Sequence, residues 1–126
     1  MINQMPSVEQ ILGMMSQKLG GEENIPAAIK YAKDVAPELI MQVAMSSMGS
    51  VEDKDSPLEP KVRTLIFLSA ALAMKDYECV RTQLRAALNM GVTKEELIAV
   101  IKIVRHAAAN GVLGVATPIL EALAGG

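Results

Sequence analysis

The 126-residue sequence contains few aromatic residues and a single cysteine, and both shortages limit what the chain can be. Tyr31, Phe67 and Tyr77 are its three aromatic residues, although 51% of all residues are hydrophobic. The core must therefore be built from aliphatic side chains, alanine and methionine, which suit packed helices. One cysteine excludes an intramolecular disulfide and suits a reducing compartment, so we expect a cytoplasmic protein.

The sequence also lacks a basic block and a long uncharged run. Its formal net charge is -2, and it has too few aromatic residues to stack bases, so we expect no nucleic-acid partner. The most apolar stretch, residues 64–74, is enclosed by Arg63 and Lys75 and is too short to cross a membrane. This stretch therefore predicts a buried helix and no membrane association.

Turn-forming residues divide the sequence into segments in which apolar residues recur at helical spacing, and no segment alternates as a strand does. Capping-box patterns at Ser7 and Thr93 predict two helix starts, and Pro37 can open a further helix. The charged segment 49–57 is the one clear linker. The expected helices cover residues 7–19, 25–35, 37–48, 58–74, 76–90, 93–109 and 112–124. We therefore predict one all-α domain over residues 1–126, compact and with about six to seven helices.

Two of the expected helices, residues 58–74 and 95–109, are apolar on nearly every face. Such helices must be covered on most sides, which a monomer of short helices cannot easily do. We therefore expect a homo-oligomer, while a compact monomer with an apolar surface is the alternative. The second of these helices should end at Asn110 and Gly111. Pro118 then either kinks the last helix or marks its true start.

Residues 58–100 contain several short features in a characteristic order. The features are Leu58, Lys61, Arg63, Leu65 and Ile66 in the first helix, Arg85-Ala86-Ala87-Leu88-Asn89 and Gly91 at the end of the second, and Thr93, Glu95, Glu96 and Leu97 at the start of the third. This region resembles the two-helix signature of the carboxymuconolactone decarboxylase and alkyl hydroperoxidase D family. Pro37–Leu39 resembles an upstream segment of the family, so the resemblance runs from Pro37 to the C-terminus. It implies an alkyl hydroperoxidase D-like fold and a trimer or hexamer.

The resemblance also indicates candidate catalytic residues. In the hydroperoxidase branch of the family, the site consists of a Glu, then Cys-x-x-Cys, then a His four residues beyond the second Cys. The corresponding residues here are Thr64, Asp76, Cys79 and Gln83, so only Cys79 matches. The decarboxylase branch also has a His at the position of Gln83. These four residues are our candidates, and three of them depart from the family pattern.

The spacing of Asp76, Cys79 and Gln83 places them on one face of a helix. Asp76 also suits the N-cap of that helix, and we favour this structural role over catalysis. The helix dipole and Lys75 favour a Cys79 thiolate, whereas Asp76 and Glu78 oppose it by like charge, so the net sign stays open. A small buried hydrophobic side chain is the alternative interpretation of Cys79.

Three functions stay open from the sequence. The first is a thiol-dependent hydroperoxide reductase that uses Cys79 and an external reductant, because the chain has no second thiol to resolve an oxidised one. The second is a decarboxylase-type lyase with a pocket around Gln83, although glutamine cannot act as a general acid or base. The third is a non-catalytic oligomer that binds a small molecule or a protein partner.

The remaining polar residues predict structural roles. His106 is the only histidine, and no cysteine or histidine spacing predicts a metal site, so we expect neither a metal nor another cofactor. His106 should lie near the C-terminal turn of its helix, where a protonated imidazole interacts favourably with the helix dipole. Arg63, Arg81 and Arg85 are expected to be surface charges or members of structural ion pairs.

Overall fold

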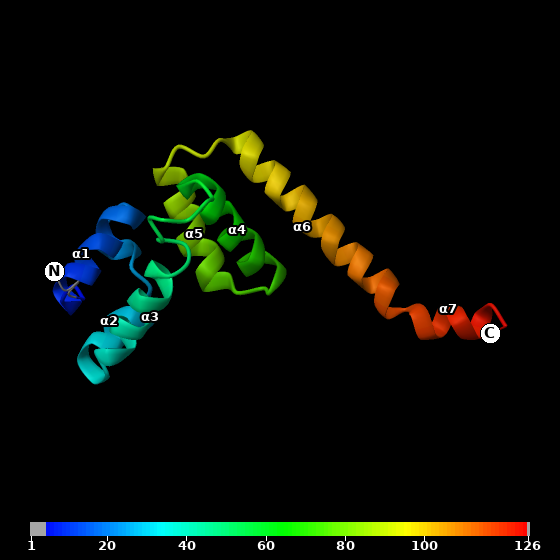
Figure 1. Cartoon of the computed structure of the whole chain (residues 1–126), viewed down its shortest axis with the longest axis horizontal. Coiled ribbons are helices and arrows are strands. Elements are labelled where there is room, and N and C mark those ends of the chain that lie inside the picture. The colour runs from blue at the N-terminus through cyan, green and yellow to red at the C-terminus, as the bar shows by residue number, and fades with distance from the viewer. Residues whose placement is uncertain (1–4, 126) are drawn as a thin grey trace.

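The structure is a computed structural model that describes residues 5–125, so the two ends of the expected domain, residues 1–4 and 126, lie outside it. Within this range the chain forms seven α-helices, one short 3-10 helix and no strand, which confirms the all-α prediction (Figure 1). The elements are α1 (Val8–Leu19), η1 (Glu22–Asn24), α2 (Ala27–Val35), α3 (Glu38–Met48), α4 (Pro60–Ala73), α5 (Tyr77–Asn89), α6 (Lys94–Val115) and α7 (Thr117–Leu123).

Helices α1, α2 and α3 form a small N-terminal cluster. The predicted capping box starts α1: the Gln10 amide donates to Ser7 Oγ at 3.1 Å, and the Ser7 amide donates to Gln10 Oε1 at 2.8 Å. Gly20 ends the helix in the left-handed conformation, with φ 83°. The buried centre of the cluster consists of Ile11, Ile40 and Ala44.

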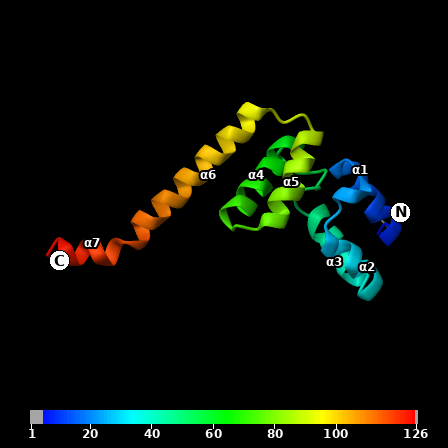
Figure 2. The ribbon, with the colours of Figure 1, turned by 180° about the vertical axis from the view of Figure 1, so that it is seen from behind.

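Helices α4 and α5 lie side by side and make the most extensive contact between any two elements (Figures 1 and 2). The buried residues of α4 are Thr64, Leu68 and Ala71, and those of α5 are Thr82, Gln83, Ala86 and Ala87. Helix α5 also contacts α1. There Asn89 Nδ2 donates to the carbonyls of Gln17 and Lys18 at 3.2 and 3.1 Å. Asn89 thus satisfies carbonyls at the C-terminal end of α1.

The turn between α4 and α5 is tight and locally strained. The Asp76 amide donates to the Ala71 carbonyl at 2.9 Å and the Lys75 amide to the Leu72 carbonyl at 3.2 Å, which is the Schellman arrangement. This arrangement needs a left-handed residue after the helix, and Lys75 supplies it with φ 58°. Glycine usually occupies such a position, because a Cβ atom makes the conformation unfavourable.

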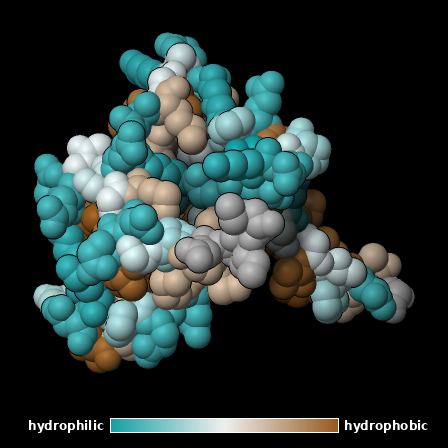
Figure 3. All heavy atoms as spheres, turned by 60° about the vertical axis from the view of Figure 1, so that its left-hand side comes forward, coloured by the Kyte–Doolittle hydropathy of each residue, from teal (hydrophilic) through white to brown (hydrophobic). Residues whose placement is uncertain are grey.

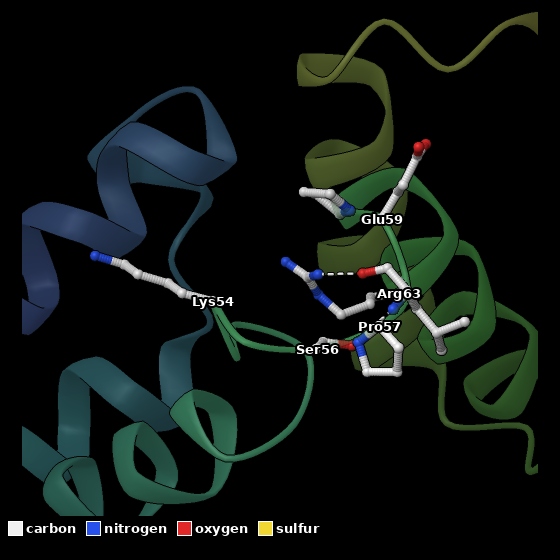
Figure 4. Close-up of a pocket in the computed structure, with 7 residues that line it drawn as sticks. Lys54, Ser56, Pro57, Glu59 and Arg63 are labelled. Carbon is white, nitrogen blue, oxygen red and sulfur yellow. Dashed lines mark hydrogen bonds between the residues drawn. The ribbon is translucent and has the colours of Figure 1, made fainter.

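Residues 49–59 connect α3 to α4, so the linker predicted for residues 49–57 is present and extends two residues further, and Arg63 attaches it to α4. Arg63 Nε donates to the Val51 carbonyl at 2.8 Å. Its Nη1 donates to the Leu58 carbonyl, as Figure 4 shows. The expectation of a surface charge or an ion pair is therefore wrong for Arg63, because its guanidinium binds backbone carbonyls. Beside it lies an open hollow of about 430 Å³, lined by residues of the linker and the start of α4.

Helix α6 starts with the predicted capping box between Thr93 and Glu96. The expected break at Asn110 and Gly111 is wrong, because α6 continues through both residues to Val115. Glycine and asparagine lower helix propensity only modestly, whereas proline removes a backbone donor and stops a helix more effectively. Pro118 indeed lies in the first turn of α7, so it marks the true start of the last helix.

The first half of α6 contacts α4, and the rest of α6 projects away from the body together with α7 (Figures 1 and 2). We call residues 103–123 the C-terminal arm. Its residues are all exposed except Val104 and Ala116, which are half-buried. Apolar side chains are visible on this projecting part in Figure 3. By length and composition α6 is also the one helix among the described residues that could cross a membrane.

Candidate functional site

The first turn of α5 is organised by Asp76. Asp76 Oδ1 accepts a hydrogen bond from the Cys79 amide at 3.1 Å, so Asp76 is the N-cap that the sequence predicted. Hydrogen bonds from the Cys79 side chain and amide hold the Asp76 pKa below its usual value. This hydrogen bond gives Asp76 a structural role as the cap of α5.

Cys79 is half-buried on the same face of α5. Desolvation, the hydrogen bond to Asp76 and the negative charges of Asp76 and Glu78 raise the pKa of its thiol to about 11. Burial, the hydrogen bond and the like charges all act in the same direction, against the thiolate. The thiol is protonated near neutral pH, where a reactive cysteine needs a thiolate.

Thr64 on α4 and Gln83 on α5 form the buried polar part of the site. Their exposed fractions are 1% and 8%, and each lies on the buried face of its helix. Among the described residues, neither Thr64 Oγ1 nor Gln83 Oε1 has a hydrogen-bond partner. Thr82, also buried, differs from both: its hydroxyl donates to the carbonyls of Glu78 and Cys79 at 3.2 Å each.

The four candidate residues thus come from two packed helices. Asp76, Cys79 and Gln83 lie along α5, and Thr64 lies on α4. The 430 Å³ hollow at the linker and a second hollow of about 590 Å³ beside α1 are lined by none of these residues. In the single chain the candidate residues therefore lie on two helices that pack together, and two of them, Thr64 and Gln83, are buried with an unpaired polar atom.

Several signature residues of the sequence have structural roles around this site. Lys61 Nζ lies 2.5 Å from Glu96 Oε2, which ties the start of α4 to the start of α6. The hydrogen bond from Lys61 is the main cause that lowers the Glu96 pKa. Together with Arg63 and Asn89, these residues fix the helix ends that hold the α4–α5 pair. The sequence order alone did not indicate these contacts, because they join residues far apart in the chain.

The other polar candidates lie outside the site. Arg81 is exposed and pairs with Glu78 at 3.5 Å, and Arg85 is exposed, as expected of surface charges. His106 is exposed in the middle of α6, where its Nε2 lies 3.1 Å from Asn110 Nδ2. The expected interaction of His106 with a helix C-terminus is wrong, because α6 continues well beyond it. No group of three potential metal ligands occurs among residues 5–125.

The elements from α3 to α7 are all helical, and they cover nearly the whole stretch in which the sequence resembles a known family. The sequence profile of the carboxymuconolactone decarboxylase family matches residues 37–122. The chain belongs to that family. No curated protein matches the sequence. The match begins at Pro37, where the resemblance from the sequence was also expected to begin.

Proposed function

We propose that this protein binds a small neutral molecule by hydrogen bonds at the α4–α5 site, with Thr64 and Gln83 as the binding residues. One observation carries the proposal: both side chains are buried and each has a polar atom without a partner among the described residues. A buried unpaired polar group costs about 1–3 kcal/mol of stability. A ligand that pairs with these atoms recovers that cost.

The two atoms define the chemistry of the ligand. Gln83 Oε1 accepts hydrogen bonds, so the ligand must present a hydroxyl or an N–H group. Thr64 Oγ1 can donate as well as accept, so it tolerates a hydroxyl or a carbonyl oxygen. Neither side chain titrates near neutral pH, so the site favours a neutral group over a carboxylate. Because both atoms are buried, the group that reaches them must be small.

A thiol-dependent hydroperoxide reductase is the second candidate. The half-buried position of Cys79 in the first turn of α5 favours it, since Cys79 stands where the peroxidase pattern has its second cysteine. A thiol pKa of about 11 and the lack of a second cysteine oppose it. In such an enzyme the hydroperoxide would oxidise the Cys79 thiol to a sulfenic acid and leave as the corresponding alcohol. Two equivalents of an external thiol would then restore the Cys79 thiol, with release of water and the external disulfide.

A decarboxylase-type lyase has less support. Gln83 cannot deliver the proton that such a reaction needs, and Arg81 and Arg85 are exposed rather than directed into the site. We place the protein in the cytoplasm in this proposal, because its one cysteine suits a reducing compartment.

The test is a thermal-shift screen with small alcohols, amides and hydroxy-ketones, run on the wild type, Thr64→Val and Cys79→Ser. We expect at least one compound to raise the Tm of the wild type and of Cys79→Ser but not of Thr64→Val. Thiol-dependent consumption of hydrogen peroxide is measured in parallel. Peroxide turnover by the wild type that is lost in Cys79→Ser, without any compound that stabilises the protein, would favour the reductase instead.

A further inference from the structure

Cys79 and Gln83 lie one helical turn apart on α5. Residues four positions apart on a helix are neighbours on its surface, with their Cβ atoms about 6 Å from each other. Cys79 is half-buried, so its thiol can be reached from solvent. Gln83 is more than nine-tenths buried, and its Oε1 atom has no hydrogen-bond partner among residues 5–125. A nucleophilic sulfur thus stands beside a buried acceptor that lacks a donor.

The thiol of Cys79 is held in its protonated form. Burial, a hydrogen bond to Asp76 and the charges of Asp76 and Glu78 raise its pKa to about 11. A protonated thiol reacts poorly with peroxides, because the nucleophile in that reaction is the thiolate. Addition to an aldehyde has a different requirement at equilibrium, because the thiol and its adduct are both neutral. The surroundings that oppose a thiolate therefore do not oppose this addition.

The unpaired atom of Gln83 distinguishes an adduct from a free aldehyde. Gln83 Oε1 only accepts hydrogen bonds, and so does the oxygen of an aldehyde, so these two atoms do not pair. When a thiol adds to an aldehyde, the carbonyl oxygen becomes a hydroxyl group, which donates. An adduct on Cys79 thus supplies, one turn from Gln83, the donor that Oε1 lacks. This pairing removes the cost of an unpaired buried acceptor and so stabilises the adduct.

We propose that Cys79 holds a small aldehyde as a reversible hemithioacetal, whose hydroxyl group donates to Gln83 Oε1. In this step a bond forms between Cys79 Sγ and the carbonyl carbon, and the carbon–oxygen π bond breaks. The thiol proton passes to the carbonyl oxygen. The Asp76 carboxylate, which accepts the hydrogen bond of the thiol, lies in place to relay this proton. No group leaves, and the step needs no oxidant, reductant or second thiol.

The inference rests on the proposed binding site and names the class of ligand that this site takes. An aldehyde is neutral and can be small, as the buried Thr64 and Gln83 require. Carboxylates and phosphates are poorly suited, because the negative charges of Asp76 and Glu78 act at Cys79 and repel anions there. Ketones add thiols less readily, because their carbonyl carbon is more hindered. The ligand class is therefore short, unhindered aldehydes.

The experiment titrates acetaldehyde, isotope-labelled at its carbonyl carbon, into the full-length wild type, Cys79→Ser, Gln83→Met and the control Arg85→Met. Carbon NMR separates the hemithioacetal from the free aldehyde, its hydrate and lysine imines, and the titration gives the Kd. We expect the adduct in the wild type and none in Cys79→Ser, which keeps every lysine. Gln83→Met should weaken the adduct about tenfold, because one hydrogen bond is lost. Arg85 is exposed on the same helix, so Arg85→Met should leave the Kd unchanged.

Two results would overturn the inference: no adduct that depends on Cys79, or the same Kd in the wild type and in Gln83→Met. Gln83→Leu, which also lacks the acceptor, replaces Gln83→Met if circular dichroism shows a loss of helix content. If neutral compounds stabilise the protein in the thermal-shift screen while acetaldehyde forms no adduct, this inference fails and the proposed function stands. If neither kind of compound binds, both fail.

Discussion

Asparagine in place of Asp76 should make Cys79 more reactive. Asparagine caps a helix about as well as aspartate, so Asp76→Asn keeps the acceptor for the Cys79 amide and removes only the charge. Asp76 raises the Cys79 pKa both through its hydrogen bond and through its charge. Without that charge the thiolate becomes less unfavourable, and the pKa of Cys79 should fall.

The size of the effect follows from the thiol pKa. With a pKa of about 11, roughly one Cys79 in a thousand is ionised at pH 8. Desolvation is the largest cause of the raised pKa and stays in the variant. Removal of the Asp76 charge should therefore increase the thiolate fraction at pH 8 on the order of tenfold.

The assay is the rate of alkylation by iodoacetamide at pH 8, followed by mass spectrometry on the native and the denatured protein. Glu78→Gln is the matched control: it removes a charge from the same helical turn, but Glu78 is the smallest cause, so the rate should rise less. An Asp76→Asn rate equal to that of the wild type, with helix content unchanged, would refute the electrostatic reasoning. It would show that burial alone sets the pKa of the Cys79 thiol.

Three further predictions concern stability. Lys75→Gly should stabilise the fold by about 1 kcal/mol and raise the Tm by a few degrees, because glycine adopts the left-handed conformation without strain. An unchanged Tm would show that the backbone of Lys75 is not strained. Asn89→Ala should cost about 1 kcal/mol in denaturant unfolding, because carbonyls at the end of α1 lose their donor, whereas the exposed Arg85→Ala should cost little. The pKa of Cys79 is higher in the folded protein than in the unfolded chain. The contribution of Cys79 to the free energy of unfolding is therefore complete below pH 9 and is lost as the pH rises toward 11. The wild type should therefore lose on the order of 1 kcal/mol more than Cys79→Ser over that range in pH-dependent unfolding, once partial exposure is allowed for.

Local sequence signals predicted most of the helices. The capping boxes at Ser7 and Thr93 and the N-cap at Asp76 all depend on residues within one turn of each other. The helix start at Pro118 was one of two alternatives that the sequence left open. Such contacts can be inferred from spacing. The break expected at Asn110 was wrong, because weak helix propensity lowers stability without ending a helix.

For the candidate site, the sequence predicted residues but not their surroundings. The family pattern located Thr64, Cys79 and Gln83, but burial and unpaired atoms depend on how α4 packs on α5. The sign of the Cys79 pKa change likewise needed the extent of burial, since dipole and like charge act in opposite directions. The role of Arg63 in binding the linker also depends on distant backbone carbonyls, which spacing does not predict.

The most direct test of the account is the unfolding free energy of the double variant Thr64→Val, Gln83→Met in the absence of any ligand. Both substitutions keep the approximate shape of the side chain and remove the buried atoms that have no partner. If these atoms are kept for a ligand rather than for the fold, the variant should be at least as stable as the wild type, and by about 1 kcal/mol per site more stable. A loss of more than about 1 kcal/mol per site would contradict the account, because it would mean that Thr64 and Gln83 already have their hydrogen bonds within the protein.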